Sequence, residues 1–213
     1  MQPAAARLTL RGDAGQALAG APGVLLLPAE GAGLPPEAQR QRQRAAARAA
    51  LAAELASALG LPAGDITLSD ERGQPPQAQR RDGAALPTIG LSISHEKALS
   101  LAAWHRGGPV GVDVLRMTGD MPRAEMDALS QLYLGIERPP AIAKTAPKAI
   151  EIRAFALAWA MHEARLKCAG LALLEWTPAL DARLAGLHCA ELALPAWAAT
   201  GHVAALAWRV PPN

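Results

Sequence analysis

Blocks of apolar and polar positions along the chain predict a mixture of helices and strands. The stretch Glu37–Leu59 consists mainly of Ala, Arg and Leu and contains neither Gly nor Pro. Within it Leu51, Leu55 and Leu59 recur at every fourth residue, a spacing that places them on one face of a helix. Gly60 follows directly and is a typical helix stop. The pattern therefore predicts a helix over Glu37–Leu59.

Shorter apolar runs predict strands on both sides of this helix. Residues 1–36 are rich in Gly, Pro and Ala, which favours weak strands separated by turns. A polar stretch with prolines over Gly64–Pro87 separates the helix from the later strands. The runs that we interpret as strands are Leu8–Leu10, Val24–Leu27, Ile89–Ser94, Leu99–Trp104 and Val110–Leu115.

The second half of the chain begins near Met117, and a loop-rich stretch with Pro139, Pro140 and Pro147 follows. A long apolar pattern from Ile150 to Ala169, closed by Gly170, then predicts a second helix. Beyond it we expect strands interrupted by prolines, the last of them Val203–Trp208.

One internal similarity bears on the fold class. Ser94-His95 followed by Leu99–Trp104 is similar to Gly201-His202 followed by Val203–Trp208. Ala-rich strands recur by chance, so duplication and coincidence are both open explanations. A true duplication predicts two α+β halves packed face to face with a cleft between them.

Composition narrows the class of protein. Of the 213 residues 51% are hydrophobic and 19% charged, which is typical of a globular protein. A net charge of only +2, with one Phe and one Tyr, argues against a nucleic-acid binder. Cys168 and Cys189 lack a CxxC spacing, so we expect a reducing compartment and no disulfide or zinc framework. The apolar run Gly23–Pro28 is too short for a membrane span, and we expect a soluble cytoplasmic protein.

The run Val110–Leu115 carries the first candidate chemistry. On a strand its three valines face one way, while Gly111 and Asp113 face the other way together with Leu115. A glycine at that position allows another backbone or a ligand to approach Asp113. The alternative is an aspartate that ends the strand and caps a turn.

A row of four residues on the second predicted helix is the next group of candidate functional residues. Phe155, Trp159, Glu163 and Lys167 are four residues apart and lie along one line of the helix surface. The row changes from aromatic to charged, which places Glu163 at the edge of buried surface. A solvated ion pair between Glu163 and Lys167 is the alternative.

Two further features are candidate anion-binding groups. Ser94 and His95 follow an apolar strand, and the first helix opens with Arg40, Arg42, Arg44 and Arg48. A lone histidine is more often a satisfied structural residue, and an arginine run is usually a solvated face. Arginine also matches phosphate with two parallel hydrogen bonds, so an anion site is the competing interpretation.

The order and spacing of these motifs resemble the larger, two-halved 4'-phosphopantetheinyl transferases, the type that activates surfactin synthetase. Asp113 follows His95 by 18 residues, and Glu163 of the Trp-x-x-x-Glu-x-x-x-Lys motif follows Asp113 by 50. The segment Ala154–Gly170 is the strongest match, and Arg72–Pro75 looks like the family's Gly-Lys-Pro turn. The resemblance extends from about Arg40 to Leu173.

This resemblance implies an α+β fold of two pseudo-symmetric halves, 1–115 and 116–213, each a long helix on a small, mostly antiparallel sheet, with the active site between them. It implies transfer of the phosphopantetheine arm from coenzyme A to a serine of an apo acyl or peptidyl carrier protein, with release of 3',5'-ADP. The partners would be coenzyme A and the carrier, with no nucleic acid or membrane, and the protein would act as a monomer.

The resemblance also implies roles for individual residues. Asp113 and Glu163 would hold Mg²⁺, whose preferred ligands are hard oxygens. Glu163 would serve as base for the serine, while Lys167, and His162 at a lysine position of the family, would lie beside the reacting phosphates. The residues implied to contact coenzyme A are Arg44, Arg48, Gln74, Pro75, Ser94, His95 and Asp113.

Three positions depart from the family pattern. Leu115 replaces a second acid two residues after Asp113, His162 replaces a lysine, and Gln74 replaces the lysine of the Gly-Lys-Pro turn. These changes favour a second interpretation, in which the protein is a catalytically impaired relative that binds coenzyme A or a carrier. An interaction domain whose motifs are coincidental is the third alternative.

Overall fold

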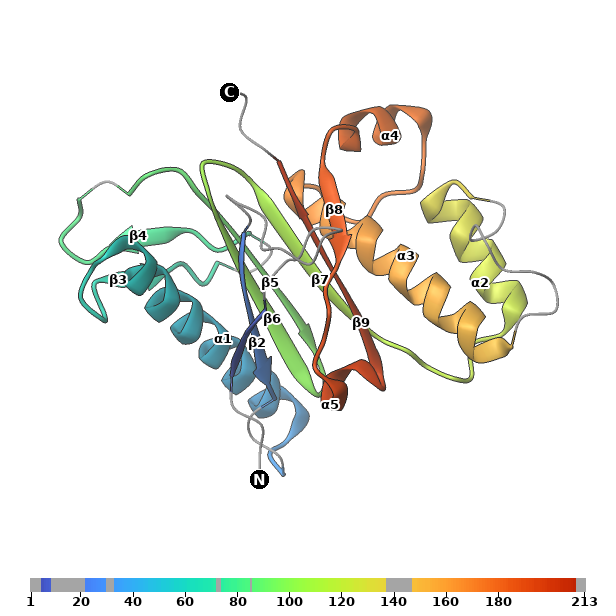
Figure 1. Ribbon diagram of the computed structural model, residues 1–213, viewed down its shortest axis with the longest axis horizontal. Helices are drawn as coiled ribbons and strands as arrows, with labels where there is room; N and C mark the ends of the chain where they lie inside the picture. Colours follow the sequence, from blue (N-terminus) through green and yellow to red (C-terminus); the bar gives the residue numbers. More distant parts are fainter. Residues whose placement is uncertain are drawn as a thin grey trace.

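Two antiparallel sheets lie between two long helices in this α+β protein (Figure 1). The structure is a computed structural model and describes residues 5–8, 22–29, 33–71, 74–84, 86–136 and 147–209. The four-stranded sheet has the order β1 (Ala6–Leu8), β2 (Gly23–Pro28), β6 (Leu99–Arg106) and β5 (Ile89–Glu96). The three-stranded sheet has the order β7 (Val110–Arg116), β9 (His202–Trp208) and β8 (His188–Glu191). The long helices are α1 (Pro36–Leu59) and α3 (Lys148–Cys168).

Shorter elements complete the described part of the chain. Strands β3 (Ile66–Leu68) and β4 (Ala78–Arg80) form a separate hairpin near α1. The remaining elements are α2 (Arg123–Leu129), the π-helical turn η1 (Ser130–Leu134), α4 (Pro178–Leu184) and α5 (Ala196–Ala199).

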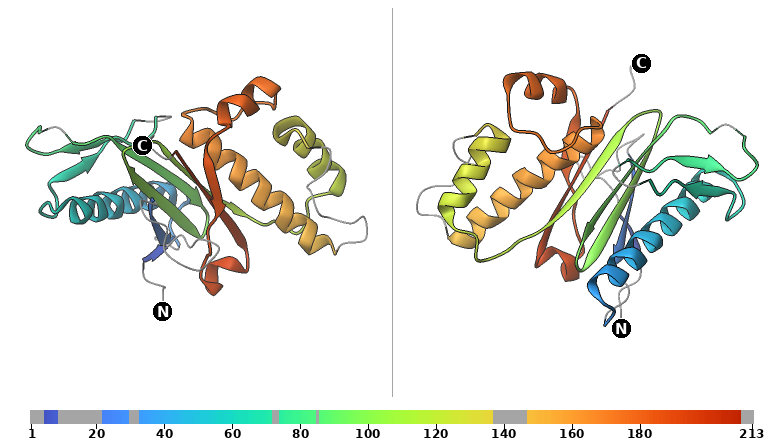
Figure 2. Two further views of the ribbon diagram at one scale, coloured as in Figure 1. Left: turned by 45° about the horizontal axis from the view of Figure 1, so that its top comes forward. Right: turned by 180° about the vertical axis from the view of Figure 1, so that it is seen from behind.

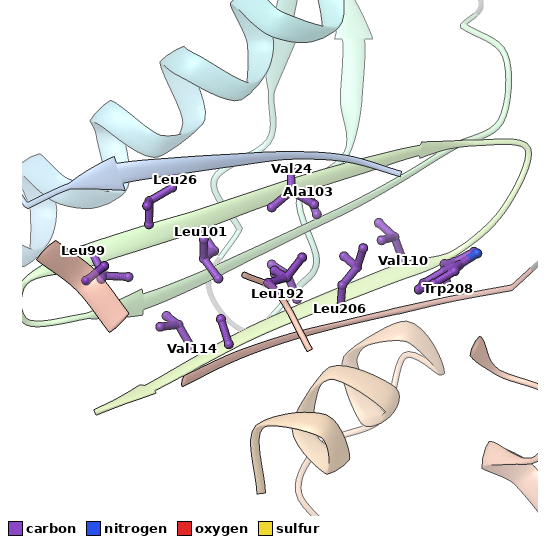
Figure 3. Close-up of a cluster of buried hydrophobic side chains, with 13 residues drawn as sticks. Val24, Leu26, Leu99, Leu101, Ala103, Val110, Val114, Leu192, Leu206 and Trp208 are labelled. Carbon is purple, nitrogen blue, oxygen red and sulfur yellow. The ribbon is translucent and has the colours of Figure 1, made fainter. Parts of the chain in front are cut away.

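Three apolar clusters stack these elements into layers. Leu51 and Leu55 of α1 pack on Leu91 and Trp104 of the four-stranded sheet. The opposite face of that sheet packs on the three-stranded sheet through a cluster that includes Leu101 of β6 and Leu206 of β9 (Figure 3). The far face of the three-stranded sheet packs on α3. The layer order is therefore α1, four-stranded sheet, three-stranded sheet and α3 (Figure 2).

Alanines bring α3 close to its sheet. Ala160 and Ala164 of α3 face Ala205 and Ala207 of β9, and all four are buried. Small side chains at a helix–sheet contact let the two backbones lie near each other. Any residue at the end of the α3 row therefore lies within reach of the strand β7.

The long helices are confirmed, and so are the strands predicted at Val24–Leu27, Ile89–Ser94, Leu99–Trp104, Val110–Leu115 and Val203–Trp208. Helix α1 ends at Gly60, which adopts φ +69° and donates its N–H to the Ser57 carbonyl oxygen. The prediction for Leu8–Leu10 lies partly outside the described residues, as do Arg72 and Gly73 of the predicted turn.

Three interpretations of connecting segments were wrong or incomplete. The polar stretch Gly64–Pro87 contains the β3–β4 hairpin, and the loop-rich stretch after Met117 contains α2 and η1. The C-terminal region contains α4 and α5 as well as strands. Pro178 opens α4 behind the cap Thr177, because proline fits the first turn of a helix, where no N–H is needed.

No helix within the described ranges is both long and apolar enough to cross a membrane.

Candidate active site

The serines of β5 meet the free edge of β7. Of the described strands, β9 pairs with one edge of β7 and none pairs with the other edge. On its other edge the Val112 N–H donates to Ser92 Oγ at 3.0 Å, and the Val114 N–H donates to Ser94 Oγ at 3.4 Å. Hydroxyls thus satisfy backbone donors that a neighbouring strand would otherwise take. This contact fixes Ser94 beside Asp113, which lies between the two valines.

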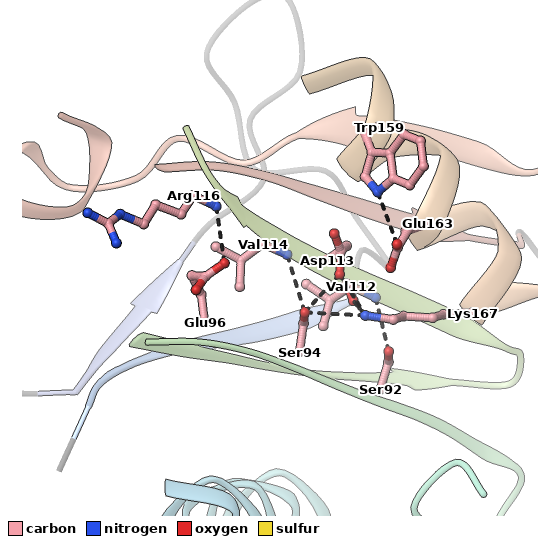
Figure 4. A network of polar contacts seen from close by, with 10 residues as sticks. All are labelled: Ser92, Ser94, Glu96, Val112, Asp113, Val114, Arg116, Trp159, Glu163 and Lys167. Atoms are coloured by element: carbon pink, nitrogen blue, oxygen red, sulfur yellow. Dashed lines mark hydrogen bonds and ion pairs between the residues drawn. The ribbon is translucent and has the colours of Figure 1, made fainter. Parts of the chain in front are cut away.

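Ser94, Asp113 and Lys167 form one hydrogen-bonded network between β5, β7 and α3 (Figure 4). Lys167 Nζ donates to Asp113 Oδ1 at 2.6 Å, to Ser94 Oγ at 3.2 Å and to the Val112 carbonyl oxygen at 3.3 Å. Ser94 Oγ donates to Asp113 Oδ1 at 2.8 Å. Three acceptors match the three N–H bonds of an ammonium group, so the network is closed.

The carboxylate of Asp113 is unusually buried for a charged group. Asp113 is only 4% exposed, in the middle of β7 opposite Ala205. Burial raises its pKa, and so does the nearby charge of Glu163, while the Lys167 ammonium and the hydrogen bond from Ser94 lower it. The alternative of an aspartate that ends a strand is therefore wrong, because β7 continues to Arg116.

Gly111 explains why α3 can lie so close to Asp113. A Cβ at this position would lie 2.0 Å from the Ala164 carbonyl oxygen and 2.5 Å from the Cys168 backbone nitrogen. The glycine therefore admits the backbone of α3, which is one of the two approaches that the sequence predicted. The close contact brings Lys167, between those two helix residues, onto Asp113.

Glu163 is held from a different direction. The Trp159 indole N–H donates to Glu163 Oε1 at 3.0 Å. The Trp159 ring packs edge-on against Tyr133 at 5.4 Å between ring centroids and also contacts Phe155. The sequence also allowed a solvated ion pair between Glu163 and Lys167. In the structure Lys167 forms its ion pair with Asp113 instead.

The two carboxylates can each offer one oxygen to a metal ion. Asp113 Oδ1 and Glu163 Oε1 accept the hydrogen bonds described above, whereas Oδ2 and Oε2 accept none within the described part of the chain. Mg²⁺ commonly takes one or two carboxylates and completes its shell with water and phosphate oxygens. No cluster of three or more His, Cys, Asp or Glu side chains suited to a metal occurs among the described residues. The donor set fits a Mg²⁺ ion that shares its shell with a phosphate ligand.

An arginine-lined cavity lies on the other side of β5. It has a volume of about 760 Å³ and is bordered by α1, β5 and the connection between β3 and β4. Four of the residues predicted to contact coenzyme A line this cavity together: Arg44, Arg48, Gln74 and His95. Arg40 also lines it. Pro75 is not among its lining residues, although the adjacent Pro76 is.

His95 is a neutral group in this cavity. Its Nδ1 lies 2.8 Å from Ser100 Oγ, while much of the imidazole is exposed. Desolvation and then the charges of Arg44, Arg48 and Lys167 lower the pKa of His95 to about 4. Because successive side chains of a strand face opposite ways, His95 lies in the arginine cavity and Ser94 in the Asp113 network.

Leu115 and His162 occupy apolar surroundings. Leu115 is half-buried and packs against the apolar cluster between α3 and the three-stranded sheet, on the same face of β7 as Asp113. It also borders a second cavity of about 310 Å³ between the end of β7 and the start of α3. His162 is 8% exposed, and its Nε2 has no hydrogen-bond partner in the part of the chain that the structure describes. Burial and then the charge of Arg165 lower its pKa, so the imidazole is neutral at pH 7. His162 lines neither of these two cavities.

Sequence reasoning missed two groups that shape these sites. Ser92 was not singled out, although Ser92-Ile93-Ser94 places two hydroxyls on one face of a strand. Asp70 was also missed, and it lines the arginine cavity with an ion pair to Arg48. An acidic residue in a polar connection gives no signal by itself, because its partner lies in a distant helix.

No family model matches this chain, and a search of curated proteins finds no match either.

Proposed function

We propose that the protein transfers the 4'-phosphopantetheine arm of coenzyme A to a serine of an acyl or peptidyl carrier protein and releases 3',5'-ADP. The observation that carries this proposal is the closed network of Ser94, Asp113 and Lys167 beside Glu163. These residues are separated by as many as 73 positions in the chain, yet their side chains meet at one point. A chance set of motifs has no reason to converge in this way.

The proposal includes an architecture of two pseudo-symmetric halves, 1–115 and 116–213. It is supported by the arrangement of the layers, since α1 covers one sheet and α3 the other. The similar segments Leu99–Trp104 and Val203–Trp208 fall on β6 and β9, and each is an inner strand of its sheet. The proposed active site then lies where the two sheets and α3 meet.

The carboxylates of Asp113 and Glu163 would hold Mg²⁺ through the oxygens that are left without hydrogen bonds. When bound, the ion would neutralise the charge of the coenzyme A pyrophosphate. Burial raises the pKa of Asp113, and the Lys167 ammonium opposes this effect because it stabilises the charged form of the carboxylate. Trp159 orients Glu163 by its indole hydrogen bond, so both ligands are fixed before substrate arrives.

The arginine cavity would hold phosphates of coenzyme A. Arg44 and Arg48 supply planar donors that suit phosphate oxygens. His95 adds a ring that gains a proton when a phosphate dianion lies beside it, and Gln74 adds a neutral amide. The coenzyme would extend around the edge strand β5 from this cavity to Asp113.

The transfer step makes one P–O bond and breaks another. The oxygen of the carrier serine bonds to the β-phosphorus, and the bond from that phosphorus to the bridging oxygen breaks, so 3',5'-ADP leaves with that oxygen. Glu163, directly or through a water that it orients, accepts the serine proton. Lys167, one helix turn further along α3, offsets negative charge at the reacting phosphate.

A second candidate is a family relative that binds coenzyme A or a carrier without turnover. It is favoured by Leu115, which packs among apolar side chains where an acid ligand is expected. The buried, neutral His162 and the uncharged Gln74 favour it as well, because both remove positive charge near the phosphates.

One experiment separates the two candidates. The protein is incubated with coenzyme A, Mg²⁺ and a panel of apo-carrier proteins, and the carriers are weighed by mass spectrometry. A gain of one phosphopantetheine unit, lost in Glu163→Gln and kept in the exposed-site control Glu175→Gln, supports the transferase. Coenzyme A binding with no gain on any carrier supports the second candidate. Absence of binding to both coenzyme A and the carriers overturns both candidates.

A further inference from the structure

The arginine cavity carries its own counter-ions. Among the described residues, its charged lining consists of three arginines and three carboxylates: Arg40, Arg44, Arg48, Glu37, Asp70 and Glu71. With His95 neutral at pH 7, the formal charges of these six residues cancel. An anion that enters this cavity therefore has to compete with carboxylates that are already there.

Among the ion pairs of the described residues in this cavity, the pair of Arg48 and Asp70 joins two different segments. Arg48 Nη2 lies 2.6 Å from Asp70 Oδ1, and Arg48 Nε donates to the Ser69 carbonyl oxygen at 3.2 Å. The pair joins α1 to the segment after β3. By contrast Glu37 pairs with Arg40 within one turn of α1, at a site where both side chains are more than half exposed.

Asp70 is free to leave, whereas its neighbour is anchored. The Ser69 N–H donates to the Gln77 carbonyl oxygen at 2.9 Å, and the Gln77 N–H donates to Ser69 Oγ at 2.9 Å. The Asp70 side chain is 80% exposed and, within the described residues, its carboxylate has no partner except Arg48, which is only 23% exposed. An exposed carboxylate regains water when it releases an arginine, so the exchange is inexpensive.

We propose that Asp70 is an exchangeable counter-ion of Arg48, which occupies the guanidinium in the empty cavity and yields it to a phosphate of the ligand. Asp70 occupies the Nη2 side of the Arg48 guanidinium, a donor that a phosphate oxygen also uses, so the carboxylate and the phosphate compete directly. A phosphomonoester carries a charge of about −1.5 to −2 at pH 7, against −1 for Asp70, and therefore displaces it. Asp70 would weaken nucleotide binding and favour release of the product. The nucleotide's identity rests on the proposed function.

A double-mutant cycle tests this exchange. The dissociation constant of 3',5'-ADP is measured by calorimetry for the wild type, Asp70→Asn, Arg48→Ala and the double variant. We expect Asp70→Asn to tighten binding roughly five-fold and to tighten it less than two-fold in the Arg48→Ala background. Asp82→Asn is the matched control, because Asp82 is an exposed acid paired with Arg80 outside this cavity, and it should leave the constant unchanged.

Two results overturn the inference in folded variants, whose integrity is checked by thermal melts. One is a dissociation constant of 3',5'-ADP that is the same for the Asp70→Asn and Asp82→Asn variants. The other is an equal gain with and without Arg48, which indicates a general field effect of the removed charge. The cycle is repeated with inorganic pyrophosphate as the ligand. If pyrophosphate shows the exchange while neither 3',5'-ADP nor coenzyme A binds, the counter-ion role stands and the proposed function fails.

Discussion

Lys167 Nζ lies 2.6 Å from Asp113 Oδ1 and joins α3 to β7 at the point where Ser94 of β5 also arrives. The contact has two consequences. It stabilises the packing of three elements, and it fixes the carboxylate that we propose as a metal ligand. Because Asp113 is 4% exposed, its charge depends on this ammonium group.

Removing Lys167 should leave a buried charge without its partner. We expect Lys167→Met to lower the free energy of unfolding by about 3 kcal/mol, as for other broken buried ion pairs. Asp113→Asn should also destabilise, but the double variant should lose clearly less than the sum of the two, since neither charge is then left alone. Urea unfolding measures all three, with Lys97→Met as control at an exposed lysine. Additive losses would contradict the coupling.

Gly111 controls the same packing through shape. Gly111→Ala places a Cβ at 2.0 Å from the Ala164 carbonyl oxygen, so α3 must move away from β7. We expect a loss of about 3 kcal/mol in the free energy of unfolding, at the upper end for an overpacked site. Gly119→Ala is the matched control, because its Cβ meets open space. Thermal or urea melts of both variants decide, and equal stability of the two would show that α3 does not press on β7 here.

The sequence predicted the α3 row because a four-residue spacing is a local property of a helix. Phe155, Trp159, Glu163 and Lys167 therefore appear on one line before any tertiary contact is known. Which partner each residue binds was not predictable. Glu163 and Lys167 suit each other locally, yet Lys167 binds Asp113, because the layers bring a strand within reach of α3.

Strand alternation in the sequence contained more than we drew from it. Ser94 and His95 were expected to meet the phosphates together, but neighbouring side chains of β5 face opposite sides. Ser94 therefore joins Asp113, while His95 joins Arg44 and Arg48. The arginine cavity itself was not predictable, because it forms only where α1 and the β3–β4 connection meet. In the sequence, the region of this hairpin is recognisable only as a polar stretch with prolines.

His95 should couple ligand binding to proton uptake. Desolvation and then Arg44, Arg48 and Lys167 lower its pKa to about 4 from an ordinary value near 6.5. A bound phosphate adds negative charge beside the imidazole and raises this pKa, so between pH 4 and pH 6.5 binding takes up a proton and tightens as the pH falls. Calorimetry with 3',5'-ADP in buffers of different ionisation enthalpy measures the uptake. His95→Gln should abolish it, and retention of the uptake would assign it to another group.

The same pKa shift predicts a direction for stability without ligand. The unfolded state binds a proton at His95 below about pH 6.5, whereas the folded state does so only near pH 4. The free energy of unfolding should therefore fall as the pH drops through that window. His95→Gln should show a smaller fall, and an identical pH profile for both proteins would count against a perturbed His95.

Leu115 is the position at which an added acid should strengthen metal binding. It shares a face of β7 with Asp113 and is half-buried at the border of a cavity, so a glutamate there can reach both water and the proposed metal. We expect Leu115→Glu to lower, by about five-fold, the Mg²⁺ concentration needed for half-maximal transfer, since a carboxylate replaces a water ligand. Thr118→Glu adds the same charge at the border of the cavity but beyond the strand, and should have no such effect.

Two effects of Leu115→Glu act against the benefit of tighter metal binding. The new charge repels the pyrophosphate, so turnover at saturating Mg²⁺ should rise little or fall. The variant also gives up the packing of Leu115 against the apolar cluster of α3 and β9, which we expect to cost about 1–2 kcal/mol of stability. Thermal melts and Mn²⁺ titration followed by electron paramagnetic resonance therefore accompany the kinetics and report on folding and metal affinity without turnover. A folded variant with unchanged Mg²⁺ dependence and unchanged Mn²⁺ affinity would show that Leu115 does not border a metal, and the metal site would then have to lie away from this end of β7.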